Sequence, residues 1–175
     1  MGKAEEIGGK YLELFKSITP EQPLANESGI LKRLKQDWVV LGLRYFPYQF
    51  MQVMADIAGE EAAADCLYRF GVGCGKEIYT RYIKLGKDKE TAMDLTCAGA
   101  TYFGWGPVEV LDREKGLARL YNSYEARSYL ANKEKAERPV CYFFGGVIVG
   151  VFSLYWDEES MVKETKCFAM GDEYC

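Results

Sequence analysis

The sequence predicts a protein of the α+β class, in which an antiparallel sheet packs against several helices. Helical periodicity occupies most of the first hundred residues. Alternating apolar and polar residues then flank a turn near position 114, and a short β-like run lies close to the C-terminus. Helices followed by a hairpin, a further helix and a strand are typical of α+β proteins. The predicted sheet therefore consists of the hairpin plus a C-terminal strand.

The composition excludes several classes of function. The chain has 175 residues, of which 49% are hydrophobic and 27% charged, and its net charge is −4. It has no basic run, which disfavours nucleic-acid binding. No stretch reaches the roughly 18 apolar residues of a membrane span, and the N-terminus lacks the apolar core of a signal peptide, so we expect a cytoplasmic protein. The absence of histidine excludes Ser–His–Asp and Cys–His catalysis and any histidine-ligated metal.

An amphipathic helix is predicted over residues 4–18. Its apolar stripe consists of Ile7, Tyr11, Leu14, Phe15 and Ile18. Pro20, Pro23 and the turn residues 26–29 interrupt it. We therefore expect residues 1–37 to form a helical arm, with a possible role in dimerisation, and residues 38–175 to form a ligand-binding domain. The alternative, in which this helix packs on its own core, stays open.

Helical patterns continue toward the middle of the chain. A short helix is predicted at 30–36, and longer helices at 48–57, 60–85 and 88–101, the last capped by Asp88. The run from Gly71 to Lys76 superficially resembles a phosphate loop. However, Glu77 replaces the required Ser or Thr and the flanks are helical. These glycines are better explained by close packing between helices.

The pattern changes to a hairpin over residues 106–122, with a turn at 113–116. Ser123 is a candidate cap for a short helix. The next helix is predicted at 139–154, with Pro139 in its first turn and Cys141 near its start. Its sequence is apolar nearly all round and rich in glycine, so it must be buried, with close approaches at Gly146 and Gly150. The final strand is predicted at 160–166.

Three thiols and a carboxylate stand at metal-ligand spacings in the last third of the chain: Cys141, Glu164, Cys167 and Cys175. Thiolates select zinc, copper(I) or iron–sulfur clusters, and one carboxylate among three thiolates fits tetrahedral zinc best. The turn residues Gly171 and Asp172 would allow Cys175 to return toward Cys167. The spacing alone leaves open the alternative of three buried cysteines and a surface glutamate.

The same residues carry a resemblance to a known family. The C-terminal third contains Pro139-Val-Cys141 with Gly145 and Gly150, followed by the motif Glu164-x-x-Cys167-x-x-x-Gly-Asp-x-x-Cys175. This pattern resembles the 4-vinyl reductase domain, a fold also found in the phenol-type sensor regions of bacterial activators and distantly similar to a subunit of a vesicle-tethering complex. The resemblance covers roughly residues 38–175. It implies that the four residues hold one zinc ion, which would be structural because four protein ligands leave no position for substrate.

The resemblance also implies a cavity for an apolar ligand. Its candidate lining is aromatic: Tyr102, Phe103, Trp105, Tyr142, Phe143 and Phe144. The phenol sensors contact the phenol hydroxyl through a His and a Trp. The Trp falls at Leu120 and the His between Ala92 and Tyr102, and neither is kept here. A ligand other than phenol is therefore expected.

Three functions follow as hypotheses. The leading one is a zinc-stabilised protein that binds a hydrophobic or aromatic small molecule as a sensor, carrier or chaperone, and that forms a homodimer. The second is an accessory protein or reductase acting on a vinyl group in tetrapyrrole synthesis. Because no dinucleotide-binding GxGxxG motif follows a strand, catalysis by this chain alone is disfavoured. The third is an assembly module that holds a structural lipid.

Overall fold

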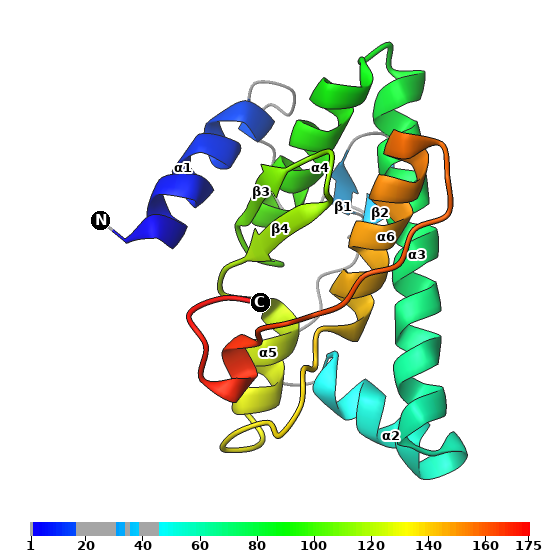
Figure 1. The fold of residues 1–175 in the computed structure, drawn as a ribbon, viewed down its shortest axis with the longest axis vertical. Coiled ribbons are helices and arrows are strands. Elements are labelled where there is room, and N and C mark those ends of the chain that lie inside the picture. Colours follow the sequence, from blue (N-terminus) through cyan, green and yellow to red (C-terminus); the bar gives the residue numbers. More distant parts are fainter. Residues whose placement is uncertain (1, 17–30, 34–35, 39–45) are drawn as a thin grey trace.

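A computed structural model describes residues 2–16, 31–33, 36–38 and 46–175 (Figure 1). It confirms the α+β class. The elements, in chain order, are α1 (Lys3–Lys16), β1 (Leu31–Arg33), β2 (Gln36–Trp38), α2 (Tyr48–Ala58), α3 (Glu60–Lys84), α4 (Lys89–Tyr102), β3 (Val108–Asp112), β4 (Leu117–Leu120), α5 (Tyr124–Leu130), α6 (Tyr142–Trp156) and a 3-10 turn, Phe168–Met170. No helix in the described part of the chain has the length and apolarity needed to cross a membrane.

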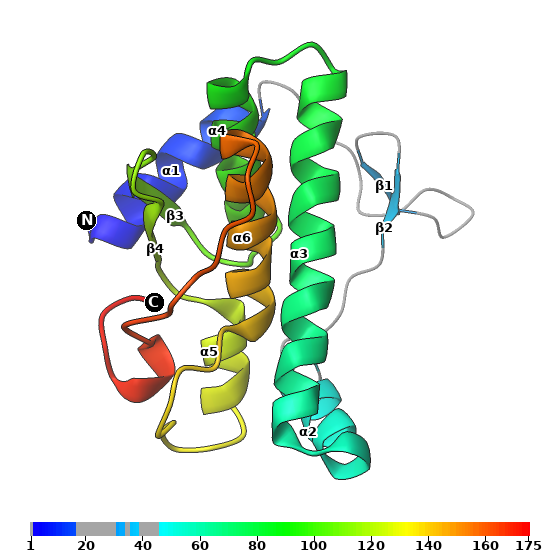
Figure 2. The same cartoon turned by 45° about the vertical axis from the view of Figure 1, so that its right-hand side comes forward.

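The long helix α3 and the apolar helix α6 lie side by side in both views (Figures 1 and 2). Glycines make this contact possible. A Cβ atom added at Gly71 or Gly75 of α3 would overlap the backbone of α6, and one added at Gly146 or Gly150 of α6 would overlap the backbone of α3. The predicted close approaches at Gly146 and Gly150 are confirmed. The run that resembles a phosphate loop lies within α3, where two of its glycines form this contact.

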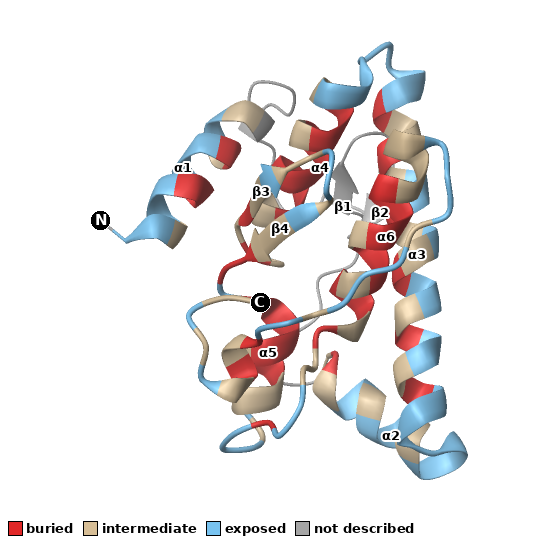
Figure 3. Cartoon of the chain, viewed as in Figure 1, coloured by how far each residue is buried: buried red, intermediate tan, exposed pale blue. Residues whose placement is uncertain are grey.

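The hairpin β3–β4 covers the other side of α6. It is antiparallel, with Val108 opposite Leu120, and a bulge lies between Val110 and Asp112. Helix α4 packs against β3, and its predicted cap is confirmed because Asp88 accepts a hydrogen bond from the Thr91 N–H at 2.8 Å. Buried residues line α4, α5, α6 and the hairpin, whereas α2 contains none (Figure 3).

Helix α1 packs on the same chain, against α4 and β3. Ile7 and Tyr11 are buried in a cluster that includes Cys97 and Ala98 of α4. Lys3 forms an ion pair with Glu109 of β3 at 3.1 Å. These contacts are those expected of a first helix on its own core. The predicted end of this helix, at residues 17–18, and the interruptions that follow it lie outside the described residues.

Three predicted elements need correction. Residues 31–33 and 36–38 form two short antiparallel strands rather than a helix, because the backbone groups of each segment pair with the other segment. Helix α6 begins at Tyr142, because Cys141 has the non-helical ψ of 54° and its N–H is bonded to the Glu164 carboxylate. Residues 160–166 form no strand.

The segment 160–166 instead runs in extended form past α6, where Ser160 and Ser153 share a hydrogen bond of 2.8 Å. The edge of β4 that faces away from β3 forms backbone hydrogen bonds with Cys175. Cys175 exchanges both backbone hydrogen bonds with Leu120, at 2.8 and 2.9 Å. This pairing places the last residue of the chain beside the sheet.

Candidate metal centre

The four predicted ligands come together in space. Cys141 precedes α6, Glu164 lies in the extended segment, Cys167 precedes the 3-10 turn, and Cys175 lies beside β4. Their ligand atoms all lie within 4.8 Å of one another. The Cys141 and Cys175 sulfurs are 3.4 Å apart, and those of Cys175 and Cys167 are 4.0 Å apart. Sulfurs that are each about 2.3 Å from a tetrahedral zinc ion would be about 3.8 Å apart. The cluster therefore has the dimensions of a metal site.

Local structure determines the return of the chain from Cys167 to Cys175. Asp172 accepts a hydrogen bond from the Cys167 N–H at 2.8 Å, and Gly171 adopts the left-handed conformation with φ of 92°. The Phe168 N–H donates to the Cys175 sulfur at 3.2 Å. The predicted Gly171–Asp172 turn is present. Together with the Leu120 pairing, it holds Cys175 in place.

The groups around the cluster also fit a metal ion. The Cys141 thiol lies 3.1 Å from the hydroxyl of Ser123, which is itself fully buried. One oxygen of Glu164, Oε2, accepts from the Cys141 N–H at 3.2 Å. The other, Oε1, is buried without a hydrogen-bond partner among the described residues. A buried carboxylate oxygen of this kind calls for a partner, and a bound cation would supply one.

The electrostatics of the cluster favour a cation. The Cys141 thiol donates to the Cys175 sulfur, and the Cys175 thiol donates to the Cys167 sulfur. The neighbouring thiols hold the pKa of Cys167 well below its usual range, and the proximity of Cys167 raises the pKa of Cys141. Burial raises the pKa of Glu164 to about 8. A divalent ion would replace the protons held by these groups, so metal binding is expected to release protons.

The sequence analysis missed Glu125, which is only 3% exposed. Its two carboxylate oxygens accept hydrogen bonds from the backbone N–H groups of Phe143 and Phe144, at 2.9 and 2.8 Å. It therefore caps the start of α6 from another helix. No local pattern indicates this role, because the bonded residues lie 18 and 19 positions away.

Glu125 should make stability depend on pH. Burial raises its pKa from 4.5 to about 8 in the folded protein. The folded state then holds a proton that the unfolded chain releases, so stability should fall as pH rises from about 5 to about 8 and level off above that. Urea unfolding at several pH values should show that the free energy of unfolding declines less with rising pH for Glu125→Gln than for the unsubstituted protein. Identical slopes would contradict the assignment.

The six aromatic residues predicted to line one cavity do not all lie around the same space. Trp105 and Phe144 line a small apolar cavity of about 20 Å³ between α4, the hairpin and α6. We call this space the apolar cavity; its other lining residues are Met93, Thr96, Cys97, Ala100, Val108, Val110, Val147, Ile148, Val151 and Phe152. Phe143 packs edge-on against Trp105, with ring centroids 5.6 Å apart. Tyr102 and Phe103 pack on each other and do not line the cavity, and Tyr142 lines a different pocket.

The apolar cavity offers few polar groups. The Thr96 hydroxyl donates to the Ala92 carbonyl at 2.8 Å, and the Cys97 thiol is kept neutral because burial raises its pKa to about 12. Leu120, where the phenol sensors have a Trp, is 4% exposed and packs in the same cluster as Val108 and Phe144. The lining therefore suits a ligand that is mostly hydrocarbon.

Comparison with known proteins connects part of the chain to a family. Residues 120–175 match the model of the 4-vinyl reductase domain. The match includes all four residues of the metal cluster and confirms the resemblance over this stretch. The remaining residues, 1–119, lie outside it.

A solved structure shares the fold of this chain. The crystal structure of the phenol-responsive sensory domain of the transcription activator PoxR with phenol superposes with a TM-score of 0.76. The superposition covers 100% of this chain and 89% of that one, at 17% sequence identity, and shows that the two share a fold. No curated protein matches the chain.

Proposed function

We propose that this protein binds a small hydrophobic or aromatic molecule in the apolar cavity, and that a structural zinc ion at Cys141, Glu164, Cys167 and Cys175 stabilises the cavity wall. The family match and the phenol-bound relative support a role in sensing such a molecule; carriage or protection of the ligand would use the same cavity. We further propose that the chain acts in the cytoplasm as a homodimer; α1, which lies in the predicted arm 1–37, also packs on the domain formed by 38–175 of its own chain.

The observation that carries this proposal is the backbone pairing between Cys175 and Leu120. It joins the metal cluster directly to β4, whose partner strand β3 contributes Val108 and Val110 to the cavity. Cys141 joins the cluster to α6, which forms the opposite wall. A metal ion at the cluster would therefore connect the hairpin to the start of α6.

The size of the apolar cavity indicates how ligand binding could change the structure of the protein. An engineered cavity that binds benzene measures about 150 Å³, whereas the apolar cavity measures about 20 Å³. A ligand must therefore move the hairpin away from α6. A two-stranded ribbon is marginally stable by itself and can shift at low cost. A movement of β4 would also move Cys175, because Cys175 is hydrogen-bonded to Leu120 of β4.

The test is the binding of toluene to the zinc-loaded protein, measured by calorimetry. Ala100→Leu adds three carbons at the cavity wall and should weaken binding at least about tenfold, which is about 1.4 kcal/mol. Ala62→Leu makes the same change on an exposed part of α3 and should leave binding unchanged. Failure of toluene to bind folded, zinc-loaded protein, or equal binding by both variants, would overturn the proposal.

A further inference from the structure

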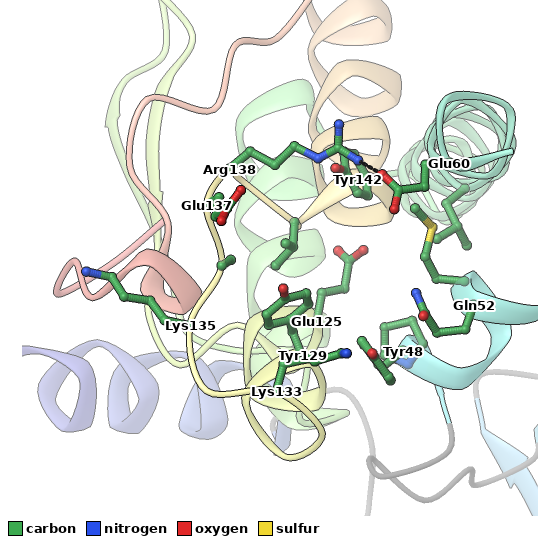
Figure 4. Close-up of a pocket in the computed structure, with 15 residues that line it drawn as sticks. Tyr48, Gln52, Glu60, Glu125, Tyr129, Lys133, Lys135, Glu137, Arg138 and Tyr142 are labelled. Atoms are coloured by element: carbon green, nitrogen blue, oxygen red, sulfur yellow. Dashed lines mark hydrogen bonds and ion pairs between the residues drawn. The ribbon is translucent and has the colours of Figure 1, made fainter. Parts of the chain in front are cut away.

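A second and larger pocket lies between α2, α5 and the loop that precedes α6 (Figure 4). Its volume is about 540 Å³, within the range of about 300–1,000 Å³ that is usual for small-molecule sites. We call it the α2–α5 pocket. It is lined from α2 by Tyr48, Met51 and Gln52, from α3 by Glu60 and Leu67, and from α5 by Glu125 and Tyr129. The loop before α6 contributes Lys133, Lys135, Ala136, Glu137, Arg138 and Val140. It is separate from the apolar cavity, with which it shares no lining residue.

The deepest polar group of this pocket is the Glu125 carboxylate, which points toward its middle in Figure 4. Each oxygen of Glu125 already accepts one backbone N–H bond, and each has a second lone pair available. Among the described residues, no Lys or Arg forms an ion pair with Glu125. A buried carboxylate in this position is complemented best by a hydrogen-bond donor that carries a positive charge.

Two aromatic rings stand beside the carboxylate. Tyr48 and Tyr129 line the pocket and contact each other edge to face, with ring centroids 5.6 Å apart. The backbone of Tyr48 is fixed in place, because its N–H donates a hydrogen bond to the buried hydroxyl of Ser128 at 3.1 Å. Tyrosine rings attract organic cations through their π-electrons and also contact the attached hydrocarbon. A carboxylate next to two tyrosines is thus suited to an ammonium group.

The remaining charges of the pocket lie nearer its mouth. Arg138 is paired with Glu60 of α3, across the opening (Figure 4). Lys133 and Glu137 are exposed on the loop, and Lys135 points away toward Gly171. Lys133 shares the pocket with Tyr48 and Tyr129, so its charge opposes a cationic ligand. Its removal is therefore expected to strengthen the binding of a cation.

We propose that the α2–α5 pocket binds a small organic molecule with a protonated amine, whose ammonium group contacts Glu125 and whose hydrocarbon part packs on Tyr48 and Tyr129. Such a ligand would contact two residues that lie next to the candidate metal centre, Glu125 and Val140. Glu125 caps the helix that follows Cys141, and the pocket wall at Val140 adjoins Cys141 itself. Occupation of this pocket would therefore stabilise the chain around the cluster.

The test is an NMR titration of the metal-loaded protein with three probes of similar size: benzylamine, benzyl alcohol and benzoate. It is run at a pH of about 8.5, above the raised pKa of Glu125, so that the carboxyl group is ionised. Benzylamine should bind saturably and shift the amide signals of Tyr48, Tyr129 and Phe143. Benzoate should bind at least about tenfold more weakly, because it places like charge against Glu125. Benzoate binding as tight as that of benzylamine, or shifts confined to the apolar cavity, would overturn the proposal.

Variants make the assignment specific. Glu125→Gln and Tyr129→Leu should each weaken benzylamine binding, by about tenfold and about threefold. Met51→Trp should fill the pocket and abolish binding even if Glu125→Gln does not fold. Lys133→Ala should strengthen binding about two- to threefold, whereas Lys87→Ala, which removes an exposed lysine that does not line the pocket, should leave it unchanged. Benzylamine binding that persists in Met51→Trp would show that the ligand lies elsewhere.

Discussion

Replacing Cys167 with serine is expected to abolish the proposed zinc binding and to lower the free energy of unfolding of the protein by at least about 3 kcal/mol. Cys167 is fully buried, and its sulfur accepts a hydrogen bond from the Cys175 thiol. The binding energy of a four-ligand structural site is folding energy, because the unfolded chain does not hold the four ligands together. Native and denaturing mass spectrometry would count the zinc, and urea unfolding would measure the stability.

Cys66→Ser provides the matched control for this experiment. Cys66 is exposed on α3, away from the cluster, so its substitution should change neither zinc content nor stability. A chelator should reduce the stability of the unsubstituted protein to that of Cys167→Ser and have little further effect on the variant. A metal-free native mass, with all six thiols open to alkylation, would rule out the zinc site.

Gly71→Ala is expected to destabilise the protein by about 3 kcal/mol or more, because it overpacks a backbone contact. The added methyl group would meet the carbonyl of Phe143 in α6, which is backbone and cannot rotate away. Helices α3 and α6 would have to separate, which would open the core around Leu67, Phe143 and Val147. Thermal and urea unfolding would measure the loss.

Gly73 lies in the same helix, two residues further on, and serves as the control. A Cβ atom added there meets nothing within 4 Å. Gly73→Ala should therefore leave the protein unchanged or stabilise it by about 0.5–1 kcal/mol, since alanine loses less backbone freedom in a helix. Equal effects at Gly71 and Gly73 would show that helix propensity, rather than the contact with α6, determines the result.

The helices and the hairpin β3–β4 could be predicted because their signals are local. Asp88 caps α4 from within its own first turn, and Ser123 does the same for α5, so each is visible in a few neighbouring residues. The four candidate ligands, which the fold brings together, could be picked out because the spacing from Glu164 to Cys175 is short and resembles a family motif. The strand predicted at 160–166 has no partner strand among the described residues, and only the folded chain reveals this.

The sequence by itself determined the class of fold, the set of four candidate ligands and the glycines that bring α3 and α6 together. The tertiary structure alone decided which distant groups meet. Glu125 reaches the start of α6 across 18 residues, and Cys175 pairs with Leu120 across 55 positions, counted from 120 to 175. Such contacts depend on how whole elements pack, and the free energy that selects them comes from burying the core rather than from the local chain.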